Sequence, residues 1–293
     1  MTDVSRWVRS KVPTSMKSSL ATRLEGLGTS TAGMRILPSF LVAGTQRSGS
    51  SSFYEYLVNH PAVGRSIIEE VHYFDWNYSK GMRWYRGHFP TTMKAAYLRR
   101  RSGAEPMTGE ATPYYIFHPL APQRIANDLP DVKLLVVLRN PVDRAYSHYQ
   151  HERAMGFEPL SFDDALAQEE LRLEGEVEKI VKEPTYRGFN HQHFSYFARG
   201  VYADQLEHLY SLFPRDRVFV VTSDELSHDP AAVYARSIEF LGLPAHTLSA
   251  FPKHNTGSYP PLEQTARERL TARYSGPNDR LYEVLGVEPL WPA

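Results

Sequence analysis

The sequence predicts an α/β fold, namely a doubly wound parallel sheet with helices on both faces in a single domain. The clearest strand is residues 133–138, Lys-Leu-Leu-Val-Val-Leu, where every residue after the lysine is apolar. Such a run is typical of a parallel strand that is covered on both faces. Short apolar runs alternate with stretches of helical spacing along the chain, and no internal repeat is present. This alternation favours one parallel sheet over an all-α or all-β fold.

Four segments are predicted as strands, namely residues 40–43, 107–110, 133–138 and 218–221. Seven are predicted as helices, namely 50–59, 142–154, 161–171, 202–213, 230–241, 261–274 and 278–285. Asn140 and Pro141 supply an N-cap and a first-turn proline for the second helix, and Ser161 supplies the cap of the third.

Composition excludes several classes of protein. The 293 residues contain no cysteine, which excludes disulfides, thiolate metal sites, Fe–S clusters and a cysteine nucleophile. The 33 basic and 33 acidic residues balance, so we expect no general attraction to nucleic acid. The longest apolar run, 134–138, is far shorter than the roughly 20 residues of a membrane helix, and no signal-like segment follows the N-terminus. We therefore expect a soluble, cytoplasmic protein.

Residues 1–35 differ from the rest, because six basic residues face two acids among many Ser, Thr and Gly. We predict a basic, loosely ordered N-terminal arm, followed by one domain over residues 36–293. A weak contact between this arm and a membrane surface is the alternative. Asp3 disfavours a transit peptide, since such peptides avoid acids.

The segment from Gly44 to Ser52 lies between a predicted strand and a predicted helix. Gly44 and Gly49 have the spacing of a P-loop, whose backbone N–H groups converge on a phosphate at a helix N-terminus. The lysine and Ser/Thr that follow in a nucleoside triphosphatase are Ser50 and Ser51 here. Arg47 supplies positive charge instead, and the neighbouring serines supply hydroxyls. The alternative is an ordinary Gly/Ser turn.

A second anion site is predicted at the end of the strand 133–138. Arg139 stands at its carboxyl end, where α/β sheets bind ligands, and Ser147 lies two helical turns further on. The alternative is that Arg139 pairs with Asp143 while Ser147 faces solvent. The two sites together suggest a nucleotide that carries separate anionic groups.

The segment Glu69-Glu70-Val71-His72-Tyr73-Phe74-Asp75-Trp76 is a candidate for acid–base chemistry. In an extended segment, Glu70 and His72 share one face. A carboxylate there can take a proton from a hydroxyl. An aromatic-rich surface strand with solvated acids is the alternative.

These motifs together resemble the sulfotransferases that use 3′-phosphoadenosine 5′-phosphosulfate (PAPS). The Gly44–Ser52 loop is similar to their 5′-phosphosulfate loop, and Leu134–Ser147 is similar to their 3′-phosphate motif. Glu-Val-His-Tyr-Phe-Asp-Trp, with Glu110-Ala111-Thr112-Pro113, resembles the heparan sulfate O-sulfotransferase branch. The resemblance runs from about residue 36 to residue 288.

The resemblance implies transfer of a sulfuryl group from PAPS to a hydroxyl of a carbohydrate, glycolipid or small metabolite, with adenosine 3′,5′-bisphosphate (PAP) as product and no metal. Glu70 would be the general base, with His72 as the other candidate, and Arg47 would stabilise charge on the leaving phosphate. The implied donor-binding residues are Arg47, Ser48, Gly49, Ser50, Ser51, Ser52, Arg139, Ser147, Lys253 and His254. The implied acceptor-binding residues are His72, Asp75, Trp76 and Tyr114.

The sequence departs from that branch in ways that bear on the acceptor. Arg47 replaces the usual loop lysine, so it keeps the charge but is a poor general acid. Ala111 replaces a lysine that reaches sulfated glycan, and the late loop offers only Lys253 and His254. We therefore expect an acceptor that is not strongly anionic. A P-loop-type kinase without the usual lysine, and a glycan- or nucleotide-binding module without turnover, remain alternatives.

Overall fold

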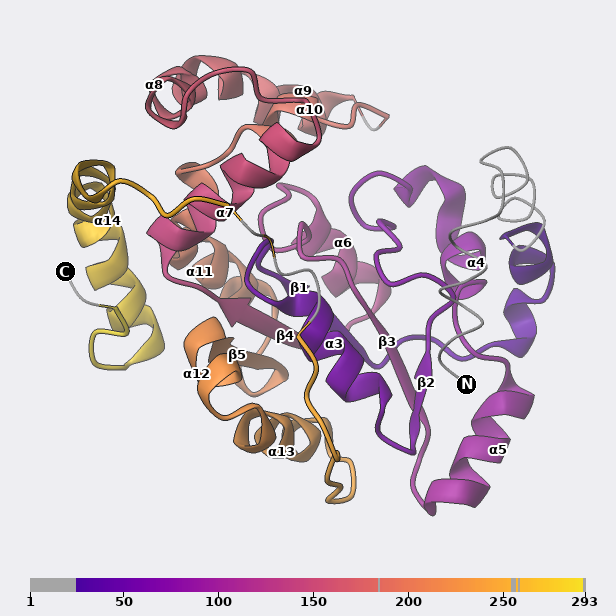
Figure 1. The fold of residues 1–293 in the computed structure, drawn as a ribbon. Coiled ribbons are helices and arrows are strands. Elements are labelled where there is room, and N and C mark those ends of the chain that lie inside the picture. The colour runs from indigo at the N-terminus through magenta and orange to yellow at the C-terminus, as the bar shows by residue number, and fades with distance from the viewer. Residues whose placement is uncertain (1–24, 184, 254–256, 258, 292–293) are drawn as a thin grey trace.

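The structure is a computed structural model that describes residues 25–183, 185–253, 257 and 259–291. Its centre is a parallel sheet of five strands in the order β2-β3-β1-β4-β5 (Figure 1). The strands are β1 (Phe40–Gly44), β2 (Val63–Arg65), β3 (Met107–Ala111), β4 (Lys133–Leu138) and β5 (Val218–Thr222). The predicted parallel α/β sheet is confirmed. β2 has only three residues and was not predicted from the sequence.

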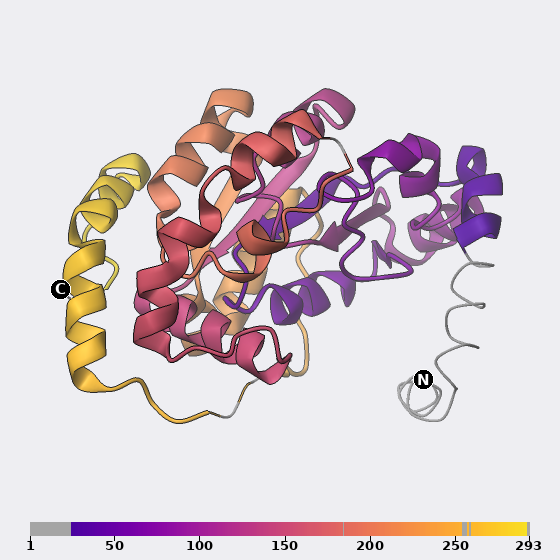
Figure 2. The same ribbon diagram turned by 90° about the horizontal axis from the view of Figure 1, so that it is seen from above.

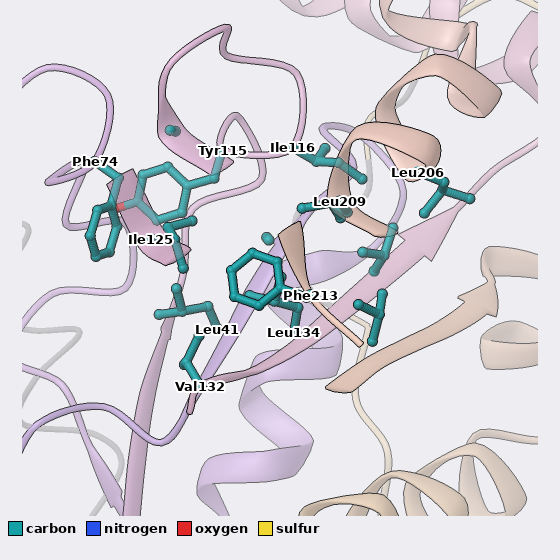
Figure 3. Close-up of a cluster of buried hydrophobic side chains, with 14 of the residues drawn as sticks. Leu41, Phe74, Tyr115, Ile116, Ile125, Val132, Leu134, Leu206, Leu209 and Phe213 are labelled. Atoms are coloured by element: carbon teal, nitrogen blue, oxygen red, sulfur yellow. The ribbon is translucent and has the colours of Figure 1, made fainter. Parts of the chain in front are cut away.

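Helices cover both faces of the sheet, because the strand side chains alternate between two apolar clusters. On one face, Phe40 and Val42 of β1 pack with α3 (Ser50–Val58), α12 (Ser223–His228) and α13 (Pro230–Leu241). On the other, Leu41 packs with α6 (Ala121–Asp128) and α11 (Tyr202–Leu212). Figure 3 shows this second cluster, in which Leu41 and Leu134 of neighbouring strands lie near Phe213.

The strand order creates a crevice at the carboxyl end of β1. The chain leaves β1 through α3 on one face and leaves β3 through α6 on the opposite face. When the connections after two adjacent strands run over opposite faces of the sheet, a crevice opens between them at the carboxyl ends of these strands. Doubly wound sheets bind their ligands in this crevice. The predicted phosphate loop follows β1 and therefore lies at this crevice.

A group of helices adjoins the same end of the sheet. These are α7 (Pro141–Ala154), α8 (Phe162–Leu173), α9 (Glu176–Lys182) and α10 (Phe189–His193), which gather at the top of Figure 1. Asn140 accepts the N–H of Val142 at 3.0 Å, and Ser161 accepts the N–H of Asp164 at 3.2 Å. Both predicted caps are thereby confirmed.

The C-terminal region corrects a prediction. Residues 261–274 and 278–285 were expected as two helices, but α14 (Gln264–Leu285) is continuous and contains Pro277. A proline inside a helix removes one backbone hydrogen bond. Packing outweighs this loss, because Leu270 and Tyr274 before the proline and Leu281 after it are all buried. Figure 2 shows α14, in yellow, along the side of the molecule opposite the N-terminal elements.

Two further helices, α4 (Gly81–Arg86) and α5 (Thr92–Ser102), belong to the region before β3 and were not predicted. The described part of the N-terminal segment packs against α4, since Trp84 Nε1 donates to Glu25 at 3.3 Å and Arg35 donates to the Phe89 carbonyl at 2.6 Å. The rest of the predicted arm, residues 1–24, lies outside the described residues. Within the described chain, no helix combines the length and apolarity required to cross a membrane.

Candidate active site

The phosphate loop joins β1 to α3 at the crevice. Gly49 immediately precedes α3 and has a φ of 95°, in the left-handed region that glycine adopts without strain. Arg47 also has a left-handed φ of 68°. Ser48 and Ser50 are buried, and the Ser48 hydroxyl lies 2.5 Å from that of Thr45. The loop therefore presents a helix N-terminus, serine hydroxyls and one guanidinium at the same point.

The two predicted anion sites are in direct contact. Arg139 donates to the Arg47 carbonyl at 2.9 Å, and Arg47 Nε donates to the Ser147 hydroxyl at 3.2 Å. Asp143 pairs instead with Arg267 at 2.6 Å. The alternative in which Arg139 pairs with Asp143 and Ser147 faces solvent therefore does not describe this structure.

Beside the loop, Glu70 and His72 lie in contact, but not through the expected extended segment that would place them on one face. His72 Nε2 is 3.2 Å from Glu70 Oε2, and its Nδ1 is 2.6 Å from Asp75 Oδ2. The segment is not extended, because His72 has a left-handed φ of 52°. The imidazole is also stacked on Trp76, with ring centroids 3.9 Å apart.

The surroundings of His72 favour its charged form. Burial lowers the pKa of His72, but hydrogen bonds and charges from Asp75 and Glu70 outweigh it and raise the pKa to about 10. The imidazolium then donates from both ring nitrogens. Glu70 is the more accessible partner, with 45% of its side chain exposed against 16% for His72.

A cavity of about 890 Å³ unites these groups. Its lining includes most of the predicted site residues, namely Arg47, Ser48, Gly49, Ser50, Ser51, Ser52, Glu70, His72, Tyr114, Arg139, Ser147 and Lys253. Asp75 and Trp76 are not among the lining residues but contact His72, and the Trp76 ring also lies 6.2 Å from that of Tyr114. His254 lies outside the described residues.

Comparisons with known proteins bear directly on this site. Residues 37–258 match the family described as the sulfotransferase domain, which is more than half of the chain. The chain belongs to the sulfotransferase family. The predicted family of PAPS-dependent enzymes is thus confirmed. The two alternatives, a kinase and a module without turnover, do not agree with membership of this family.

Relatives of this sulfotransferase match along most of its length. Heparan sulfate glucosamine 3-O-sulfotransferase 6 of Mus musculus is 29% identical and covers 94% of this chain and 80% of its own. The Homo sapiens protein of that name is 30% identical, covering 88% of this chain and 75% of its own. A sulfotransferase structure from Alicyclobacillus acidocaldarius is 31% identical, with a TM-score of 0.61 and coverage of 86% of this chain and 97% of its own.

The sulfotransferase cavity also contains residues that the sequence analysis missed. Glu152 is buried and lies 2.8 Å from His193 Nδ1. Burial raises the pKa of Glu152, but the neighbouring His148 and His193 outweigh it and lower the pKa to about 2. His193 follows Glu152 by 41 residues, so no spacing could have indicated the pair.

Arg199 is the second omission. It is 1% exposed, lines the cavity and donates to the side chain of Gln46 in the phosphate loop. Its guanidinium also lies 4.9 Å from the Tyr114 ring centroid. The sequence around Arg199, Phe-Ala-Arg-Gly, matches no known binding motif, so Arg199 was not predicted. Only the fold places it beside the phosphate loop.

Proposed function

We propose that this sulfotransferase uses PAPS as donor, with Glu70 as the general base. The observation that carries the donor assignment is the contact between the two anion sites at one end of the sheet. Among the described residues, four Arg and Lys side chains line the cavity, namely Arg47, Arg139, Arg199 and Lys253. They match a nucleotide with a phosphosulfate and a separate 3′-phosphate, and about 890 Å³ lies within the usual range for small-ligand sites.

The phosphosulfate would occupy the Gly44–Ser52 loop, where N–H groups and Arg47 face the anion. The 3′-phosphate would lie against Arg139 and Ser147. Since Arg47 touches Ser147 and Arg139 touches the loop, the residues around the two anionic groups support one another. Such preorganised donors stabilise charge that develops on the leaving phosphate.

In the proposed step, the acceptor hydroxyl oxygen attacks sulfur while the bond from sulfur to the bridging oxygen breaks. The sulfuryl group ends on the acceptor, PAP departs with the bridging oxygen, and the hydroxyl proton moves to Glu70. His72 is a weaker candidate for the base, because both of its nitrogens face carboxylates and its pKa is raised to about 10. It would instead orient Glu70. No residue in this step requires a metal.

We further propose a hydroxyl acceptor of carbohydrate type without strong negative charge. The Mus musculus and Homo sapiens relatives named above are heparan sulfate glucosamine 3-O-sulfotransferases by name. Apart from the four donor-side cations, no described lining residue is Lys or Arg, whereas Glu70 and Glu152 both line the cavity. Label transfer from PAPS to neutral methyl glycosides should therefore exceed transfer to N-sulfated heparan, and the reverse order would contradict this acceptor class.

The donor assignment is tested by titration calorimetry with PAP, adenosine 5′-phosphate and ATP–Mg²⁺. PAP should bind most tightly. Arg139→Ala should weaken PAP at least about tenfold, because a charge-assisted hydrogen bond contributes about 1.5–3 kcal/mol. Arg101→Ala, on the exposed surface of α5, is the matched control and should bind as wild type does. Equal affinity for PAP and adenosine 5′-phosphate would show that the 3′-phosphate site is wrongly placed.

A further inference from the structure

A buried carboxylate contacts the backbone that follows the proposed base. Glu110, near the carboxyl end of β3, is 0% exposed. It accepts hydrogen bonds from the hydroxyls of Tyr115 at 2.7 Å, Tyr85 at 3.1 Å and Thr112, and from the Val71 N–H at 3.4 Å. Burial raises the pKa of Glu110 to about 7, and the hydrogen bonds from Thr112, Tyr115 and Val71 act in the opposite direction by favouring its charged form. Four donors thus converge on Glu110.

Two of these hydroxyls also bind the backbone that carries the base. Thr112 Oγ1 accepts the N–H of His72 at 3.4 Å, and the Tyr115 hydroxyl accepts that of Tyr73 at 2.9 Å. A hydroxyl can donate only one proton, and the hydroxyls of Thr112 and Tyr115 each donate theirs to Glu110. Their oxygens are therefore free to accept the backbone N–H groups. Three consecutive N–H groups, of residues 71 to 73, therefore end on Glu110 either directly or through one hydroxyl.

This arrangement holds an unfavourable backbone conformation. His72 has a φ of 52°, which a residue other than glycine keeps only when its surroundings fix it. From the same strand as Glu110, the Ala111 N–H donates to the Glu69 carbonyl at 3.0 Å. The turn that results directs the imidazole at both Glu70 and Asp75.

We propose that Glu110 is a positioning residue, which acts through Thr112 and Tyr115 to fix the backbone of residues 71–73 and thereby the placement of Glu70 and His72 in the cavity. It touches no reacting atom. The inference rests on the proposed function only in that Glu70 is taken as the base.

The test compares Tyr115→Phe with Tyr85→Phe in the full-length protein. Each variant removes one hydroxyl donor from the same Glu110 oxygen, but only Tyr115 also accepts a backbone N–H. The readout is the titration of the His72 imidazole by NMR, without donor or acceptor. The charged or titratable groups facing His72 are Glu70, Asp75, Glu110 and His118.

Tyr115→Phe should lower the midpoint of the His72 titration by at least about one pH unit, a tenfold change in proton affinity, because the ring loses its fixed placement between two carboxylates. Tyr85→Phe should shift it by less than half as much. Equal shifts in both variants, or none in Tyr115→Phe, would overturn the proposal. The titration can succeed even if no sulfuryl transfer is found, so it separates this inference from the proposed function.

A second pair keeps the test decisive should Tyr115→Phe fail to fold. Thr112→Val removes the hydroxyl with little change of shape, whereas Thr112→Ser keeps it. We expect Thr112→Val to lower the His72 midpoint and to reduce kcat for label transfer to methyl glycosides at least tenfold, with PAP affinity unchanged. Thr112→Ser should restore both. Failure of serine to restore them would show that the threonine acts through packing and not through the hydroxyl relay.

Discussion

The surroundings of His72 could be predicted from the sequence only in part. Its spacing from Glu70 predicts that the two residues share one face of an extended segment, but this expected segment is wrong, and they meet through a left-handed turn at His72. The left-handed turn depends on Thr112 and Tyr115, some 40 residues away, which no local pattern reveals. Arg139 and Ser147 were predictable for a different reason. A buried strand followed by Arg, an N-cap and Pro fixes where the helix begins and which side chains point back to the sheet.

The charge of His72 makes stability depend on pH. Its pKa is raised from 6.5 to about 10, so its contribution is fully present below pH 6.5 and is lost as pH rises towards 10. His72→Asn removes the titration, and asparagine tolerates a left-handed φ. The difference in free energy of unfolding between wild type and variant should shrink by at least about 1.4 kcal/mol between pH 6 and pH 9.5. Denaturant titrations measure it, and a difference independent of pH would contradict the assigned contacts.

At the scale of elements, prediction succeeded where a helix or strand carries its own signals. β4 is continuously apolar, and α7 begins with Asn140 and Pro141. Prediction failed where tertiary packing determines whether a strand forms or where a helix ends. β2 has three residues and is defined by pairing with β3, and α14 continues through Pro277 because both of its halves are buried.

The pairing of β1 with β3 requires a glycine at position 109. A Cβ there would lie 2.4 Å from the Phe40 carbonyl oxygen, which is backbone and cannot move aside without loss of the strand pairing. Gly109→Ala should therefore lower the free energy of unfolding by about 2–3 kcal/mol. Gly33→Ala is the control, since nothing lies within 4 Å of the added carbon, and should stay within about 0.5 kcal/mol. Thermal or denaturant unfolding distinguishes them, and equal stabilities would refute the close approach.

For the whole molecule, the strand order assembles the site from distant parts of the chain. The phosphate loop follows β1, the second anion site follows β4, and residues 70–72 lie against the end of β3. In a doubly wound sheet the carboxyl ends of parallel strands lie at one edge, so the phosphate loop and the second anion site could be predicted to lie at the same edge. Glu152 lies on the predicted helix that follows β4, but its partner His193 and Arg199 could not be placed, because the long segment that carries them after α7 has no regular spacing relative to the strands.

The most direct test of the account is transfer of label from [³⁵S]PAPS to methyl glycosides by wild type and by Glu70→Gln. The substitution keeps the size of the side chain but removes its basicity. We expect wild type to transfer label and Glu70→Gln to lose at least about a hundredfold in rate, as removal of a general base usually costs, while both bind PAP equally. Equal transfer by the two proteins would contradict the assignment of the base.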